Sequence, residues 1–244
     1  MMTDFSWLGR TSLLIGKDAV QRLANSHVMV VGLGGVGSFA AEFVARSGVG
    51  TMTIIDGDVV DPTNRNRQLP ALATNHGEPK AQIMAERLKA INPEITLHVV
   101  QSFVTPTLVD DILKNPPHFI IDAIDSITPK LTFLSTAFHK GIPIVSSMGA
   151  GAKLDPTQLE VTDISKTNEC VFAQQIRKTL KRNHQIYKGI TCVFSPEKPR
   201  KESLMLTDGS NYKKSAYGTI SYMPAVFGAV TASVAIRKLI GEPI

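Results

Sequence analysis

A glycine-rich segment at residues 32–37, together with charged and amide side chains after it, carries the chemistry that this sequence can perform. The segment reads Gly-Leu-Gly-Gly-Val-Gly and follows the apolar run 27–31. Its glycines let the backbone turn tightly and approach phosphate oxygens, while the helix that follows directs its N-terminus at the negative charge. The glycines concerned are Gly32, Gly34, Gly35 and Gly37. Such a turn between a strand and a helix predicts a nucleotide or dinucleotide site.

A carboxylate follows at the end of the next apolar run. Asp56 lies nineteen residues after Gly37, at a position where a side chain can accept hydrogen bonds from both ribose hydroxyls. An NAD-dependent oxidoreductase explains the pattern up to this point, and so does a nucleotide-binding module without catalysis.

The residues beyond Asp56 are ones that NAD does not need. They supply a further acid, two amides, a guanidinium and an ammonium, namely Asp58, Asn64, Arg67, Gln68 and Lys80. A triphosphate that is held for attack at its α-phosphorus needs such donors together with a magnesium ion. Asp125, at the end of another strand, is the candidate magnesium ligand. Each residue alone would suit a salt bridge or a loop cap, but the set predicts bound ATP and adenylation.

Apolar runs that alternate with amphipathic segments predict the fold. Strands are expected at 27–32, 52–55, 95–100, 119–121 and 142–145, with helices at 35–46, from 79 to 91, from 105 toward 114, and from 129 to 141. This alternation predicts an α/β protein with a Rossmann-like, mainly parallel sheet and helices on both faces. Ligands of such sheets bind beyond the carboxyl ends of the strands, where the glycine segment, Asp56 and Asp125 all fall.

The periodicity weakens after residue 147. We expect short strands at 161–164 and 191–194, a helix at 171–182, a polar loop at 195–215 and a final helix at 224–240. A membrane span is the alternative for the last segment, but its unbroken apolar part is short, so burial in the fold is favoured and no membrane contact is expected. The organisation expected is one domain over 1–244, with a nucleotide-binding core at 27–146 and a C-terminal extension at 147–244.

Composition narrows the class of protein. The 244 residues are 43% hydrophobic, which fits an ordinary globular protein with a sizeable core. Two cysteines without a Cys-x-x-Cys pair argue against a disulfide framework and a cysteine-rich zinc site, and favour a reducing, cytoplasmic compartment. The first residues lack a basic stretch followed by an apolar core, so no signal peptide is expected.

Positive charge is concentrated in the basic segment 177–214. It holds ten Lys and Arg residues against three acidic ones, in a chain whose net charge is +5. A patch confined to one region favours a polyanion partner, and a solvated lysine-rich loop is the alternative. Interleaved aromatic residues could stack on bases, although burial is the commoner outcome; these are Tyr187, Phe194, Tyr212 and Tyr217.

Taken together, the motifs resemble the E1-like activating superfamily, and within it the tRNA threonylcarbamoyladenosine dehydratases. The resemblance covers nearly the whole chain and is strongest over 10–165. It rests on the glycine segment, Asp56-x-Asp58, Asn-Arg-Asn-Arg-Gln at 64–68, Lys80 and Asp122-Ala-Ile-Asp125, with further stretches at 10–16, 40–50, 84–93, 103–106, 120–126, 155–158 and 192–195.

The resemblance implies an activity. Enzymes of this kind use ATP to activate the carboxyl of the threonylcarbamoyl group on an adenosine beside the tRNA anticodon, and loss of water then closes a ring. The implied partner is tRNA, and the implied cofactors are ATP and Mg²⁺. The resemblance also implies a role for each residue. Gly34 and its neighbours would hold the α-phosphate, and Asp56 would hold the ribose. The polyphosphate would be bound by Asn64, Arg67 and Lys80, and the magnesium ion by Asp125.

The resemblance also implies a homodimer. In relatives an N-terminal arginine reaches into the ATP site of the partner subunit, and Arg10 matches that position, while Trp7 stands where an earlier arginine is common. The alternative for Arg10 is an ordinary surface arginine before a helix.

A second activity of the superfamily is adenylation of the C-terminal glycine of a ubiquitin-like sulfur-carrier protein. The absence of zinc cysteines and the presence of the basic segment weigh against it. Cys170 lies in an expected loop and is a candidate nucleophile, whereas Cys192 lies in an expected strand, where burial is the usual case. Some tRNA-modifying relatives are linked to cysteine desulfurase partners, but nothing in this sequence shows such a link.

Overall fold

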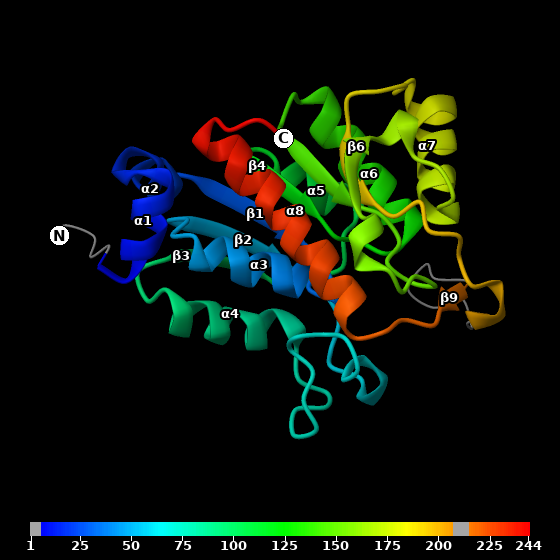
Figure 1. The fold of residues 1–244 in the computed structure, drawn as a ribbon, viewed down its shortest axis with the longest axis horizontal. Helices are drawn as coiled ribbons and strands as arrows, with labels where there is room; N and C mark the ends of the chain where they lie inside the picture. Colours follow the sequence, from blue (N-terminus) through cyan, green and yellow to red (C-terminus); the bar gives the residue numbers. More distant parts are fainter. Residues whose placement is uncertain (1–5, 207–214) are drawn as a thin grey trace.

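A seven-stranded sheet covered by helices on both faces forms the centre of the computed structural model, which describes residues 6–206 and 215–244 (Figure 1). The strands are β1 (His27–Val31), β2 (Thr51–Ile55), β3 (Thr96–Val100), β4 (Phe119–Asp122), β5 (Ile144–Ser147), β6 (Glu160–Asp163) and β7 (Thr191–Phe194). Their order is β3-β2-β1-β4-β5-β7-β6, and β6 alone runs antiparallel to its neighbour. The predicted Rossmann-like, mainly parallel sheet is therefore confirmed.

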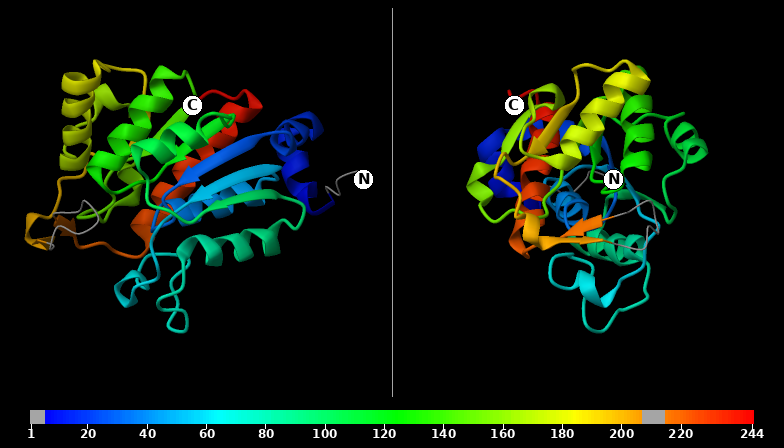
Figure 2. Two further views of the ribbon diagram at one scale, coloured as in Figure 1. Left: turned by 180° about the vertical axis from the view of Figure 1, so that it is seen from behind. Right: turned by 90° about the vertical axis from the view of Figure 1, so that its right-hand side faces the viewer.

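Eight α-helices accompany the sheet in the described ranges. They are α1 (Gly9–Ile15), α2 (Lys17–Ala24), α3 (Gly37–Arg46), α4 (Lys80–Ile91), α5 (Pro106–Ile112), α6 (Ile127–His139), α7 (Val171–His184) and α8 (Tyr222–Ile240). Apolar residues of α3, α4 and α8 form one core, and those of α5, α6 and α7 form another. The helices that carry these two cores cover opposite faces of the sheet (Figures 1 and 2).

Strand β1 shows why the sheet is covered on both faces. Val28 and Val30 belong to one core, whereas Met29 and Val31 belong to the other, because successive side chains of a strand point to opposite sides. All four side chains are buried. A continuous apolar run of this kind is typical of a parallel strand between two helix layers.

Among the described helices, α8 alone is long and apolar enough to cross a membrane, judged by length and composition only. Its most apolar stretch of 18 residues has a mean hydropathy of 1.4, and 44% of that stretch is buried inside the fold. In the fold it packs against α2, α3 and strands β4, β5 and β7. Gly228 allows the close approach to α3, since a Cβ there would lie 2.5 Å from the carbonyl oxygen of Val36. The packing of α8 follows the prediction of a final helix within the fold.

Two predicted elements differ from the structure. Helix α6 begins at Ile127 rather than after Pro129, because proline is tolerated in the first turn of a helix, where its missing N–H is not needed. The predicted loop 195–215 contains strand β8 (Leu204–Leu206), which pairs antiparallel with β9 (Ser215–Tyr217). The loop prediction is wrong there because β8 has only three residues, all exposed, and shows no alternation of burial. Residues 207–214 of that prediction lie outside the described residues.

Candidate active site

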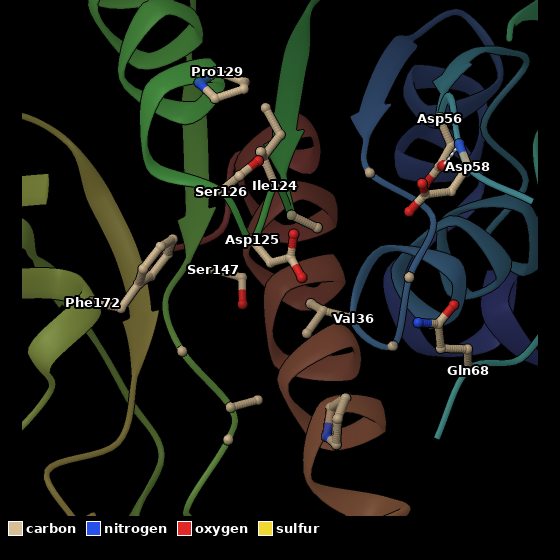
Figure 3. A pocket seen from close by; sticks show the side chains of 18 of the residues that line it. Val36, Asp56, Asp58, Gln68, Ile124, Asp125, Ser126, Pro129, Ser147 and Phe172 are labelled. Carbon is tan, nitrogen blue, oxygen red and sulfur yellow. Dashed lines mark hydrogen bonds between the residues drawn. The ribbon is translucent and has the colours of Figure 1, made fainter. Parts of the chain in front are cut away.

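A cavity of about 540 Å³ lies at the carboxyl ends of the parallel strands (Figure 3). Its wall is formed at the ends of five strands. The contributing residues come from 32–36 after β1, 56–58 after β2, 102–104 after β3, 123–126 after β4 and 147–151 at the end of β5. Residues of α7 and of the β8–β9 hairpin complete it. The sheet thus brings together the glycine segment, Asp56 and Asp125, as the predicted topology requires.

The glycines of the glycine segment serve two different purposes. At Gly37 a Cβ would lie 1.7 Å from the carbonyl oxygen of Gly32, and at Gly32 (φ +87°) a Cβ would lie 2.8 Å from that of Ala123, so both residues allow the turn itself. At Gly34 the nearest atom to a Cβ would be Nε2 of Gln68, 3.7 Å away. The protein therefore leaves space open above Gly34, on the side where a phosphate would approach the backbone.

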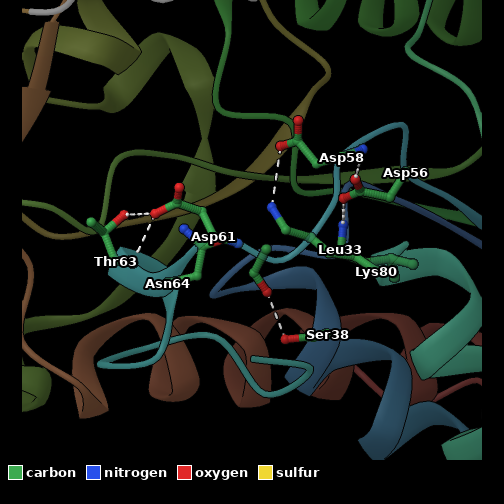
Figure 4. A network of polar contacts seen from close by, with 9 residues as sticks. Leu33, Ser38, Asp56, Asp58, Asp61, Thr63, Asn64 and Lys80 are labelled. Carbon is green, nitrogen blue, oxygen red and sulfur yellow. Dashed lines mark hydrogen bonds and ion pairs between the residues drawn. The ribbon is translucent and has the colours of Figure 1, made fainter. Parts of the chain in front are cut away.

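Asp56 fastens the glycine segment to the end of β2. Its Oδ2 accepts a hydrogen bond from the Leu33 amide at 2.6 Å, and its Oδ1 accepts one from the Asp58 amide at 2.7 Å (Figure 4). Burial raises the pKa of this carboxyl, and the two amide hydrogen bonds act in the opposite direction. Because each carboxylate oxygen has a second lone pair, the same group can also accept from a ligand in the cavity that it lines.

Lys80 and Asp58 form an ion pair at the start of α4. The Lys80 Nζ lies 3.2 Å from Asp58 Oδ2, and the lysine side chain is only 5% exposed while the aspartate is 45% exposed (Figure 4). Both residues line the cavity. The helix thus presents a cation whose stem is buried and whose charge faces the ligand space.

Arg67 and Gln68 line the same wall. The Arg67 guanidinium donates to the carbonyl of Thr63 and to Oδ1 of Asn66, both at 2.9 Å. Among the described residues, the Oε1 of Gln68 is the buried side-chain oxygen that has no hydrogen-bond partner. Because a buried acceptor without a partner is costly, this oxygen indicates that the wall is shaped for a donor from a ligand.

Asp125 points into the middle of the cavity, between Val36 and Ser147 (Figure 3). Among the described residues, no group of three His, Cys, Asp or Glu side chains could hold a metal ion. A carboxylate in this place can contact a ligand in the cavity.

Asn64 and Arg10 do not line the cavity of their own chain. Asn64 is buried in a turn, where its Oδ1 accepts from the Asp61 amide at 3.2 Å and closes a capping box. Arg10 is exposed on α1. The neighbouring Leu8 packs against Gly48, just before β2 begins, so α1 lies at the amino ends of the strands, opposite the cavity.

The comparison with known proteins agrees with this geometry. Residues 8–244 match the ThiF family. The chain belongs to the ThiF family. It is 40% identical to a tRNA threonylcarbamoyladenosine dehydratase of Escherichia coli K12, over 96% of this chain and 93% of the relative. It is 38% identical to the protein of that name from Bacillus subtilis 168, over 99% and 96%.

A solved structure shows the same likeness in three dimensions. The crystal structure of the E. coli tRNA N6-threonylcarbamoyladenosine dehydratase in complex with ATP superposes with a TM-score of 0.88 at 40% identity, and covers 97% of this chain and 95% of that one. The predicted resemblance to the E1-like superfamily is therefore confirmed for this ThiF-family chain, in sequence and in fold.

A buried ion pair, which the sequence patterns do not predict, lies under the cavity. Lys130 and Asp122 are both fully buried, with Nζ 2.7 Å from Oδ2. The ammonium also donates to the carbonyls of Ile124 at 3.0 Å and Ser147 at 2.9 Å. This pair ties the end of β4 to the end of β5, and so fixes the segment that carries Asp125. The available signal was a lysine inside the apolar sequence of α6.

Both cysteines of this ThiF-family chain are buried. The Sγ of Cys170 caps α7 by accepting from the Ala173 amide at 3.5 Å. Burial raises the pKa of the Cys192 thiol to about 12, which keeps it protonated and unreactive at neutral pH. The burial of Cys192 agrees with the prediction from the sequence.

Proposed function

We propose that this chain is an ATP-dependent tRNA threonylcarbamoyladenosine dehydratase that works by carboxyl adenylation. The observation that carries the proposal is the cavity wall, in which the open space above Gly34 lies beside Gln68 and faces Lys80, Arg67 and Asp125. The names of the relatives that match nearly the whole chain support the choice of tRNA as substrate.

The reaction balances without a nucleophile from the protein. In the first step, a carboxylate oxygen of the substrate bonds to the α-phosphorus of ATP and the bond to pyrophosphate breaks. In the second step, the urea nitrogen of the same substituent bonds to the acyl carbon, loses its proton, and AMP leaves. The net change is loss of water from the nucleoside and cleavage of ATP to AMP and pyrophosphate. The protein has to position the groups and stabilise the charge.

Each residue of the cavity wall would bind the part of ATP that lies nearest to it. Asp56 would hold the ribose at the end of β2, and the amides around Gly34 and Gly35 would hold the α-phosphate at the end of β1. Arg67, Lys80 and Gln68 would bind the polyphosphate, with Asp58 orienting Lys80. Asn64 would act by holding the turn that carries Arg67. Gly32 and Gly37 would shape the loop.

Magnesium fits this site at Asp125, where it would neutralise charge on the phosphate oxygens. Lys130 holds the Asp125 segment through the Ile124 carbonyl, so the carboxylate enters the cavity from a fixed backbone. The nucleotide-binding core 27–146 would then be the adenylating part of one domain, and the extension 147–244 would receive the tRNA.

Exposed basic residues of the extension support tRNA as the partner. They are Lys178, Lys181, Arg182, Lys188, Lys198, Arg200 and Lys201, while Lys213 and Lys214 lie outside the described residues. Lysine and arginine on one region attract RNA phosphates. Of the aromatic residues in this segment, Tyr187 is 60% exposed and Phe194 is fully buried, so stacking by Phe194 is excluded, and Tyr212 lies outside the described residues.

The assembly and the compartment follow from the same proposal. We infer a homodimer, because Arg10 faces away from its own cavity, and a cytoplasmic location, because the substrate is tRNA. A cysteine desulfurase partner that passed sulfur onto this chain would require an accessible thiol on it. Since Cys170 and Cys192 are both buried, such a partner is left out of the proposal.

One assay tests the function. The enzyme is incubated with ATP, magnesium and tRNA that bears threonylcarbamoyladenosine, and the nucleosides are then analysed by mass. We expect the mass loss of one water on that nucleoside, together with AMP and pyrophosphate in equal amounts. Cleavage of ATP at the α-phosphate that depends on a sulfur-carrier protein, with the tRNA unchanged, would contradict the proposal and favour the second activity of the superfamily.

A further inference from the structure

The cavity continues well beyond the residues that the adenylation chemistry uses. Past Asp125 its wall is formed by 147–151 after β5, by Val171, Phe172 and Gln175 of α7, and by Leu204 and Tyr217 of the hairpin. Figure 3 shows Phe172 on one side of the space, Asp56 and Asp58 on the other, and Asp125 between them.

The strand order assigns the two ends of the cavity to different ligands. Segment 102–104 follows β3, Asp56 follows β2, and Gly34 follows β1, and these three strands are neighbours in that order. A nucleotide whose ribose contacts Asp56 and whose α-phosphate lies at Gly34 therefore extends toward the β3 side. Because adjacent strands lie about 4.8 Å apart, the ends of β4 and β5 and the start of α7 remain for the group that attacks the α-phosphorus.

The wall of this second half differs in chemistry from that of the first. In the described part of the chain, its lining contains no charged side chain and consists of aromatic, aliphatic, amide and hydroxyl groups. The members are Ser147, Met148, Gly149, Ala150, Gly151, Val171, Phe172, Gln175, Leu204, Tyr217 and Thr219. A wall of this kind suits an uncharged planar ring rather than another phosphate group.

Phe172 presents an aromatic ring at this wall (Figure 3). Its Cβ would be in ordinary van der Waals contact, at 3.5 Å, with a Cβ at Gly149, so the start of α7 lies against the segment that follows β5. The ammonium of Lys130 lies 5.6 Å from the ring centroid, a distance at which a cation is attracted to an aromatic face. The group that fixes the Asp125 segment thus also contacts the Phe172 ring.

We propose that this half of the cavity is the acceptor subsite, and that Phe172 stacks on the adenine base of the tRNA nucleoside whose carboxylate is adenylated. Bases that are splayed out of single-stranded RNA loops are commonly stacked on aromatic side chains. With the base on Phe172, the substituent on its amino group is directed toward Asp125 and Gly34, where the α-phosphorus is attacked. This subsite rests on the proposed function, since it takes the nucleoside of that reaction.

The decisive variant is Phe172→Leu, which keeps an apolar side chain and removes the aromatic face. We expect the KM for tRNA bearing threonylcarbamoyladenosine to rise about 10- to 100-fold, the usual effect of losing one stacked base, with kcat little changed because stacking is made equally in the ground state. The Kd for ATP should stay within about twofold of the wild type, since Phe172 is on the far side of Asp125. Phe172→Tyr and Phe172→Trp should restore the KM.

Phe138→Leu is the matched control, because Phe138 is a partly buried aromatic on the same face of the sheet and does not line the cavity. The KM of Phe138→Leu for tRNA should equal that of the wild type. The melting temperatures of all variants are compared to check that each variant is folded. An unchanged KM in Phe172→Leu would overturn the subsite, and so would a parallel loss of ATP affinity. The wild-type reaction distinguishes failure of the subsite from failure of the proposed function. If the wild-type enzyme binds ATP but does not dehydrate the tRNA nucleoside, the proposed function itself is overturned.

Discussion

The Lys80 ammonium lies 3.2 Å from the Asp58 carboxylate, and the two groups differ sharply in exposure, with the lysine almost covered and the aspartate nearly half exposed. The Asp58 side chain can therefore rotate toward the solvent when a phosphate group binds in the cavity, whereas the Lys80 side chain cannot move away from the cavity. In the protein without ligand, Asp58 neutralises the charge of the Lys80 ammonium. When a phosphate binds, it can replace Asp58 as the partner of this ammonium. This arrangement leads to the first prediction.

Lys80→Gln should raise the Kd for ATP about 10- to 100-fold, because a hydrogen bond to a charged group contributes about 1.5–3 kcal/mol. Asp58→Asn should have a smaller effect, since it removes the competing carboxylate together with the orienting contact. Titration calorimetry with ATP and magnesium measures both. Equal ATP affinity in Lys80→Gln and the wild type would remove Lys80 from the polyphosphate site.

Gly34→Ala separates binding of the phosphate from folding. The added methyl would meet only the side-chain amide of Gln68, with Nε2 at 3.7 Å and Cδ at 3.9 Å, which are ordinary contact distances. The melting temperature should therefore stay near that of the wild type. The methyl fills the space that we assign to the α-phosphate, and should cost about 1–3 kcal/mol of binding free energy, or on the order of 10- to 100-fold in the Kd for ATP.

Two other glycines serve as controls for that measurement. Gly9→Ala, with nothing within 4 Å of its added methyl, should change neither stability nor ATP affinity. Gly37→Ala should destabilise the protein itself, because its Cβ would lie 1.7 Å from a backbone oxygen. Full ATP affinity in Gly34→Ala would show that the phosphate lies elsewhere.

The buried pair of Lys130 and Asp122 makes a prediction about stability. Lys130→Met should reduce the free energy of unfolding by about 3–5 kcal/mol, because it leaves the Asp122 carboxylate buried without its partner. The double variant Lys130→Met/Asp122→Asn should recover part of the loss, since no uncompensated charge remains. Urea unfolding of the wild type, both single variants and the double variant measures the coupling. Additive effects would mean that the two groups do not act as a pair.

The residues just discussed show how far the sequence predicts the structure. The sheet, its neighbouring helices and the meeting of the strand ends were predictable because apolar periodicity and glycine turns are local signals. The ion pair was not predictable, because the aspartate and the lysine come from different elements. The apolar sequence around Lys130 is a signal that this lysine is buried, but it does not indicate which residue is its partner. The same holds for Asn64, whose amide type suits a phosphate ligand as well as the capping role in which the structure places it.

The acceptor half of the cavity shows the other limit. Phe172 has the sequence pattern of a core residue, and only the packing of α7 against the end of β5 places its ring at the cavity. The hairpin strands β8 and β9 are too short to give a periodic signal. Residues of the candidate site that come from strand ends were thus found from the sequence, whereas those contributed by the C-terminal extension required the tertiary structure.

Three histidines near the amino end of β1 predict a pH dependence of stability. Burial lowers the pKa of His27, and the nearby His98 and His118 lower it further. The unfolded chain therefore binds a proton on His27 at a higher pH than the folded protein does, so stability should fall as the pH drops from the ordinary histidine pKa of about 6.5 toward the lower folded value.

His27→Gln should flatten this part of the stability profile, since glutamine can still bond to the Thr53 hydroxyl, which lies 2.8 Å from the His27 Nε2. The exposed His76 supplies the control variant His76→Gln, whose profile should follow the wild type. Unfolding midpoints in urea between pH 5 and pH 8 measure the difference. A wild-type stability that rises on acidification through this range would contradict the assignment.

Arg10 tests whether two chains share one active site. The residue lies at the amino ends of the strands while the cavity lies at their carboxyl ends, so a catalytic role requires the cavity of a second subunit. If Arg10 acts in trans, Arg10→Ala chains mixed with Lys80→Ala chains form hybrid dimers with one intact site. The purified hybrid should then have about half of the wild-type activity, since one of its two sites contains both residues.

A mixture of Lys80→Ala with Arg67→Ala is the matched control, because both residues line the same cavity of one chain and no hybrid contains an intact site. The chains are co-expressed with different tags, the hybrids are purified through both tags, and dehydration of the tRNA nucleoside is measured. Activity in the Arg10 hybrid, with none in the control and none in the homodimer of either parent chain, would place Arg10 in the partner's site. If the Arg10→Ala homodimer by itself keeps wild-type activity, Arg10 is an ordinary surface residue, and the cavity works with the groups of a single chain. If that homodimer is inactive and the hybrid is inactive too, while both chains are folded and dimeric, Arg10 does not act in trans.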